Sequence, residues 1–203
     1  MTADPETVLD AFIGLVSERG FAQVTLRDVA VAADLGLVDL YKLYPDKVAL
    51  VSAFMARIDS LVLAGTPRQI DQEETTRDRL FDVMMRRYDA LRSYRAALAS
   101  IRQALGRDPL LALALGPSVR RSMAAMLEAA GVSSEGLSGA VRQNGLLAIH
   151  YAVSNVFAKD DSVDLSKTMA ALDGRLKTAE RWVQAIDKYA YSRSAGAAPS
   201  RPS

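Results

Sequence analysis

Apolar residues recur along most of the chain at the spacing of an amphipathic helix. Near the N-terminus, Val8, Phe12 and Val16 follow one another at intervals of four, which places them on one face of a helix. Pro5 at the beginning of this segment and Gly20 at its end are typical helix start and stop residues. No segment alternates apolar and polar residues as a half-buried strand does, so we predict an all-helical chain.

Capping and breaking residues divide this pattern into separate helices. Thr25 and Asp28 have the spacing of a capping box, and Gly116-Pro117 predicts a split or a kink because proline has no N–H to donate. The predicted helices cover residues 5–19, 26–33, 37–43, 47–64, 73–91, 94–105, 110–115, 118–130, 135–158 and 165–190. Residues 192–203 are rich in Ser, Ala, Pro and Arg, which favours a disordered tail.

Composition excludes several classes of function. The chain has no Cys and one His, which excludes disulfides, thiolate metal sites and paired-histidine metal sites. It contains no glycine-rich phosphate loop, nucleophile elbow or zinc-binding helix motif, so we expect no enzyme activity, cofactor or metal. No apolar run approaches about 18 residues and the N-terminus does not resemble a signal peptide, so we expect a cytoplasmic protein without a membrane span.

The first 50 residues have the pattern of a helix-turn-helix. Three short helices are expected there, and a tight turn that contains Gly36 joins the last two. Residues 25–30 (TLRDVA) and 40–47 (LYKLYPDK) resemble the TetR family of transcriptional regulators. This resemblance implies a DNA-binding helix-turn-helix domain over residues 1–55 and a helical ligand-binding and dimerisation domain over residues 56–191. It further implies a homodimeric repressor whose binding to double-stranded DNA is modulated by an apolar small molecule.

The resemblance also indicates which side chains contact DNA. In the family, the tyrosine at the position of Tyr41 and the lysine at the position of Lys47 touch phosphates, and a hydroxyl and an ammonium group suit that role. The full set of expected DNA-binding residues is Thr25, Arg27, Leu37, Tyr41, Lys42 and Lys47.

The charge of the same region leaves a second function open. Residues 1–50 contain eight acidic and four basic residues, whereas DNA-binding surfaces are usually basic. On the expected recognition helix, Val38 cannot hydrogen-bond a base edge and Asp39 would be repelled by phosphates. Residues 156–162 and 168–176 look like the C-terminal signature of lipid-binding proteins of ubiquinone biosynthesis, which share the TetR fold. The alternative is therefore a dimer that binds a lipid or isoprenoid-like molecule and not DNA.

Either function requires a ligand pocket in the second domain. Methionine is deformable and suits cavities that accept varied apolar ligands, and ligand sites usually combine such residues with a few polar groups. On this basis the expected pocket residues are Phe81, Met84, Met85, Tyr88, Met123, Met126, His150, Tyr151 and Phe157.

Overall fold

The computed structural model describes residues 4–71 and 73–195, and internal contacts divide the chain into two units. Unit 1 is Met1–Leu147 and unit 2 is Ala148–Ser203. Within the described residues the regular structure is helical and no strand occurs, which confirms the all-helical prediction. The boundary between the units falls inside a helix, so the predicted division at residue 55 stays a prediction.

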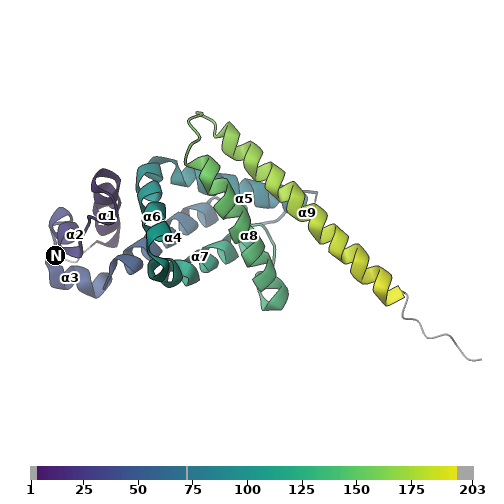
Figure 1. The fold of residues 1–203 in the computed structure, drawn as a ribbon, viewed down its shortest axis with the longest axis horizontal. Helices are drawn as coiled ribbons and strands as arrows, with labels where there is room; N and C mark the ends of the chain where they lie inside the picture. Colours follow the sequence, from purple (N-terminus) through teal and green to yellow (C-terminus); the bar gives the residue numbers. More distant parts are fainter. Residues whose placement is uncertain (1–3, 72, 196–203) are drawn as a thin grey trace, which may run out of the picture. The chain divides into compact units, whose positions relative to one another are not determined.

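Unit 1 begins with three helices that pack on one another (Figure 1). They are α1 (Pro5–Arg19), α2 (Leu26–Ala32) and α3 (Leu37–Leu43). Their inward faces are fully apolar: Val8, Phe12, Val29 and Leu40 have no exposed surface. This burial holds α2 and α3 in a fixed arrangement, because a packed core allows few alternative positions.

Unit 1 continues with longer helices and a short 3₁₀ turn, before the first part of the helix that follows them. They are α4 (Lys47–Ala64), α5 (Thr76–Leu91), the 3₁₀ turn η1 (Arg92–Tyr94), α6 (Arg95–Arg107) and α7 (Pro109–Ala129). Helices α4 and α7 pack extensively against each other, and α6 packs against α1. Helix α5 begins at Thr76 and not at the expected Glu73, because the hydroxyl of Thr75 accepts a hydrogen bond from the amide of Asp78 and caps the helix there.

Helix α7 runs without a break through Pro117, so the expected separation into two helices is wrong. Proline removes the backbone hydrogen bond to the carbonyl of Leu113, four residues earlier. The burial of Leu115 and Met123 on either side of Pro117 offsets this loss.

Among the described residues α7 also has the length and apolar composition of a membrane span. A single such helix is weak support for a span, and α7 packs on α4, α5 and α6.

Helix α8 (Gly136–Phe157) starts in unit 1 and ends in unit 2, where α9 (Ser166–Ala195) follows it. Unit 2 buries Val153, Leu165 and Leu172. Helix α9 continues past Ser192, where we expected the disordered tail to begin. The remainder of that expected tail, residues 196–203, lies outside the described residues.

The turn after α7 depends on a glycine. Gly131 has a φ of +70°, and a Cβ built there would lie 2.2 Å from Cδ1 of Ile70. We expect Gly131→Ala to lower the free energy of unfolding by about 1–2 kcal/mol, since both the backbone and Ile70 would be strained. The matched control is Gly106→Ala in α6, where nothing lies within 4 Å, and it should raise stability by about 0.5–1 kcal/mol. Urea denaturation of both variants checks this, and equal effects would contradict it.

Candidate nucleic-acid interface

Local hydrogen bonds fix the start of α2. The hydroxyl of Thr25 accepts from the amide of Asp28, and the carboxylate of Asp28 accepts from the amide and the hydroxyl of Thr25. This is the predicted capping box. The bond from the Thr25 hydroxyl lowers the pKa of Asp28 below its usual value, so the carboxylate stays charged. Thr25 is thereby occupied as a helix cap, although it remains exposed beside α2.

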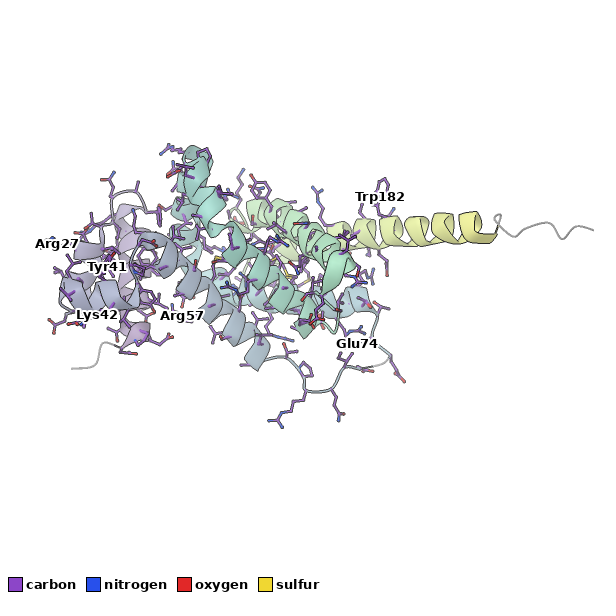
Figure 2. All side chains as sticks on the ribbon, turned by 90° about the horizontal axis from the view of Figure 1, so that it is seen from below. Arg27, Tyr41, Lys42, Arg57, Glu74 and Trp182 are labelled. Atoms are coloured by element: carbon purple, nitrogen blue, oxygen red, sulfur yellow. The ribbon has the colours of Figure 1, made fainter. Side chains whose placement is uncertain are left out.

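The outward face of α2 and α3 gathers most of the expected DNA-binding side chains. Arg27 on α2 and Tyr41 and Lys42 on α3 are exposed and lie together at this end of unit 1 (Figure 2). Leu37, at the first turn of α3, is also exposed. The structure therefore brings Arg27, Tyr41 and Lys42 together at this end of unit 1, and Leu37 lies one helix turn before Tyr41 on α3. We call the exposed surface of α2 and α3 the α2–α3 face.

Apolar and acidic groups share this face. Val31 and Val38 are 76% and 69% exposed, which is unusual for valine side chains in a packed domain. Asp39 lies on the same helix turn as Lys42, and the ammonium of Lys42 donates a hydrogen bond of 3.1 Å to its carboxylate. The positive charge of Lys42 is thus partly neutralised by its own neighbour.

Lys47, another of the expected DNA-binding residues, contacts the loop between α1 and α2, and its contact with phosphate stays a prediction. Its ammonium donates a hydrogen bond of 2.9 Å to the carbonyl of Phe21 and lies 4.4 Å from the centre of the Phe21 ring. Burial lowers the pKa of Lys47, and the side chain is only partly exposed. In this arrangement Lys47 stabilises the loop between α1 and α2.

The same loop is held from the other side by α6. The amide of Phe21 donates a hydrogen bond of 2.7 Å to the hydroxyl of Ser100. Lys47, Phe21 and Ser100 therefore form a continuous link from the first turn of α4 through the α1–α2 loop to α6. The sequence offered no sign of this link, because its partners are distant in the chain and one of them is a backbone group.

The side chain of Arg57 in α4 holds α1 in place through two ion pairs. Its guanidinium donates to the carboxylates of Glu6 and Asp10 at 3.1 Å and 2.6 Å. It also lies over the rings of Phe54 and Tyr94. Arg57 is largely buried and both carboxylates are exposed, so the ion pairs lie at the edge of the domain. They hold α1 against α4.

The nine expected pocket residues are distributed over both units. In unit 1, Met84, Tyr88, Met123 and Met126 have no exposed surface, Met85 is buried and Phe81 is partly exposed. Burial raises the pKa of Tyr88 above its usual value. In unit 2, Phe157 is buried, His150 is partly exposed and Tyr151 is 67% exposed. The use of these residues as a pocket stays a prediction.

Within the described part of the chain no group of three or more His, Cys, Asp or Glu side chains could hold a metal ion.

No protein-family model and no curated protein sequence matches the chain. Solved structures do. A TetR transcriptional regulator from Nitrosomonas europaea is 19% identical, with a TM-score of 0.68 over 87% of this chain and 97% of that one.

Two further structures support the same fold. A TetR transcriptional regulator from Rhodococcus sp. RHA1 is 21% identical, with a TM-score of 0.59 over 84% of this chain and 93% of that one. The multidrug binding protein EbrR, in complex with imidazole, is 22% identical, with a TM-score of 0.53 over 86% and 92%. The chain therefore has the fold of TetR-family transcriptional regulators over most of its length.

Proposed function

We propose that the chain is a homodimeric transcriptional regulator that binds double-stranded DNA through the α2–α3 face and responds to a small molecule. The observation that carries this proposal is the exposure of Arg27, Tyr41 and Lys42 together on a helix-turn-helix whose core is fully packed. In such motifs the second helix enters the major groove while flanking side chains contact phosphates. With this function we expect no catalysis and a cytoplasmic protein.

Exposed apolar side chains on the last two helices support dimerisation. On the part of α8 in unit 1, Leu137 and Val141 are 86% and 67% exposed. In unit 2, Trp182 of α9 is 68% exposed and Met169 of the same helix is also exposed. Apolar surface of this kind is commonly covered by a second copy of the chain, because contact between copies removes it from water.

A second candidate function rests on the apolar and acidic side chains of the α2–α3 face. Val31, Val38 and Asp39 are poor partners for DNA and would suit a protein that binds a lipid without binding DNA. Mass spectrometry of the purified protein separates the two candidates. A co-purified lipid together with no DNA complex would favour the lipid-binding protein.

A mobility-shift assay with the DNA upstream of the chain's own gene tests the main proposal. At about 50 mM salt, where the phosphate contribution is largest, we expect a complex with wild-type protein. Arg27→Gln should weaken it about tenfold or more. The matched control, Arg107→Gln at the exposed end of α6, removes the same charge and should have little effect. Failure of the wild-type protein to bind at low salt would exclude the proposal.

Removing the carboxylate of Asp39 should strengthen DNA binding. Asparagine at this position abolishes one repulsive charge and frees Lys42 from its ion pair. We expect Asp39→Asn to raise affinity about three- to tenfold at low salt and to steepen the dependence of affinity on salt by roughly one phosphate contact. Fluorescence anisotropy over a salt series measures both quantities. Unchanged affinity and slope would show that Asp39 and Lys42 lie away from the DNA.

A further inference from the structure

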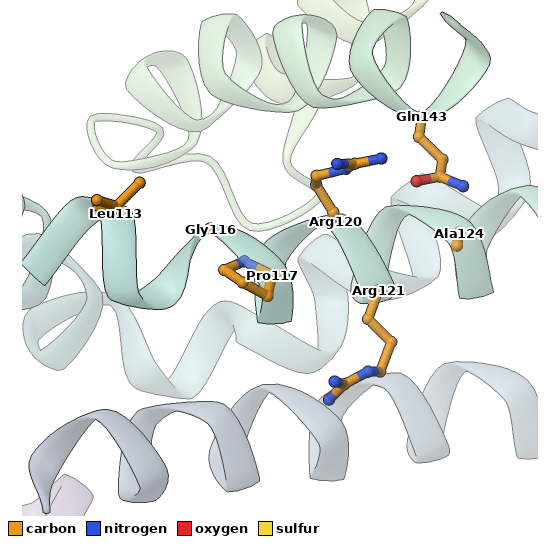
Figure 3. A pocket seen from close by; sticks show the side chains of 7 residues that line it. All are labelled: Leu113, Gly116, Pro117, Arg120, Arg121, Ala124 and Gln143. Atoms are coloured by element: carbon orange, nitrogen blue, oxygen red, sulfur yellow. The ribbon is translucent and has the colours of Figure 1, made fainter. Parts of the chain in front are cut away.

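A pocket of about 590 Å³ opens between α7 and the first half of α8, entirely within unit 1. It is lined by Leu113, Gly116, Pro117, Arg120, Arg121, Ala124 and Gln143. Figure 3 shows the side chains of Arg120 and Gln143 reaching toward the same space from opposite helices. None of the residues expected from the sequence to form a pocket belongs to this one.

The pocket is strongly positive for its size. The residues that line it include Arg120 and Arg121 and no Asp or Glu. In the described part of the chain, neither Arg120 nor Arg121 forms an ion pair or a hydrogen bond, and both are exposed. This contrasts with Arg57, Arg77 and Arg87, each of which is paired with a carboxylate. Figure 3 shows the guanidinium of Arg120 on the side of α7 that faces Gln143 and that of Arg121 on the opposite side of the helix. Beside Gln143 a ligand would therefore meet Arg120, and a guanidinium without a counter-charge favours an anion.

Most of the remaining lining is apolar. Leu113, Pro117 and Ala124 present hydrocarbon surface to the pocket. The side-chain amide of Gln143 donates to the carbonyl of Ser134, which fixes the orientation of the side chain. The lining therefore combines a guanidinium group with apolar side chains.

We propose that this pocket binds a small organic carboxylate with an apolar body. A guanidinium group pairs with a carboxylate through two parallel hydrogen bonds, and its planar shape suits that geometry better than a lysine would. The pocket volume lies within the range of small-molecule sites, roughly 300–1,000 Å³. The proposed ligand class is therefore an amphipathic anion, whereas the family resemblance implied an apolar molecule.

The position of the pocket on α7 gives a bound ligand a route to the rest of unit 1. Ser118 and Ser122 lie on the same helix as the lining residues, and their hydroxyls donate to Ser52 and Asp59 of α4 at 2.8 Å and 2.7 Å. Helix α4 begins at Lys47, directly after the α2–α3 face. A ligand that shifts α7 would thereby displace α4, and this regulatory role rests on the proposed function.

Isothermal titration calorimetry of the full chain without DNA tests the binding site. Octanoate should bind with a Kd below roughly 1 mM, while octylamine, which has the same chain length and the opposite charge, should not bind. Arg120→Gln combined with Arg121→Gln should weaken octanoate binding at least tenfold. The matched control, Arg107→Gln with Arg142→Gln, changes the net charge equally outside the pocket lining and should retain the wild-type Kd.

Ala124→Trp provides a second variant that keeps both arginines. It should fill the pocket and abolish octanoate binding while the circular dichroism spectrum stays native. The proposal is overturned if octanoate does not bind, if octylamine binds equally well, or if the arginine variant binds as the wild type does. Because no DNA is present, these outcomes are distinct from a failure of DNA binding.

Discussion

Replacing Arg87 by alanine is expected to lower the free energy of unfolding by about 3–5 kcal/mol. Arg87 of α5 is buried, and its guanidinium forms an ion pair with Asp59 of α4. The same carboxylate oxygen accepts a hydrogen bond from the hydroxyl of Ser122 in α7. Three helices therefore meet at one carboxylate, and the loss of Arg87 would leave that charge buried and without its cation.

A double variant separates the cost of an unpaired charge from the value of the pair. Arg87→Met with Asp59→Leu removes both charges and restores apolar volume, so it should recover most of the lost stability. Urea denaturation followed by circular dichroism gives the free energies. A cost below about 1 kcal/mol for Arg87→Ala would contradict the account, because it would mean that the ion pair is solvated in the native state.

Asp160→Asn should destabilise unit 2 by about 2–4 kcal/mol. The carboxylate of Asp160 is buried and accepts four hydrogen bonds, two from Ser162 and two from Thr168 at the start of α9. The side chain of asparagine has one oxygen and one N–H₂ group. The donors of Ser162 or those of Thr168 would therefore face the N–H₂ group and lose their acceptor. The matched control is Asp161→Asn, whose carboxylate is exposed and pairs with Lys167, and it should change stability little.

The same carboxylate predicts an acid-sensitive unit 2. Burial by itself would raise the pKa of Asp160, but the hydrogen bonds from Ser162 and Thr168 outweigh it and hold the pKa well below 3.8. Because the pKa of Asp160 is lower in the native chain than in the unfolded chain, its carboxylate contributes to the stability of unit 2 above pH 3.8. This contribution declines as the pH falls further. Hydrogen exchange of the amides at the start of α9 should accelerate over that range in the wild type. If Asp160→Asn exchanges with the same pH dependence, the carboxylate does not carry the effect.

The helix boundaries that could be predicted from the sequence are those set by local contacts. The capping box of Thr25 and Asp28 joins residues three positions apart, so its geometry follows from the sequence spacing. Asp46 likewise caps α4 at the predicted residue through the amide of Ala49. Of the split or kink predicted at Pro117, the split does not occur, since α7 is continuous and packs on α4, and the kink stays a prediction.

The contacts that could not be predicted join residues distant in the chain. Lys47 donates to the backbone carbonyl of Phe21, and no sequence pattern marks a carbonyl as an acceptor. The ion pair of Arg87 with Asp59 requires two separate helices to be placed first. Composition does not distinguish residues that line a pocket from residues that pack in a core: Met84 and Met123 are fully buried, and their role in a ligand pocket stays a prediction.

Hydroxyl-radical footprinting of the DNA upstream of the chain's own gene tests the central claim most directly. At about 50 mM salt a homodimer that reads DNA through the α2–α3 face should protect two stretches related by two-fold symmetry. Their centres should lie about one helical turn, or a multiple of it, apart. Arg27→Gln combined with Tyr41→Ala should abolish this protection while the protein stays folded. An unprotected upstream region with the wild type, or an unchanged footprint with the variant, would contradict the account.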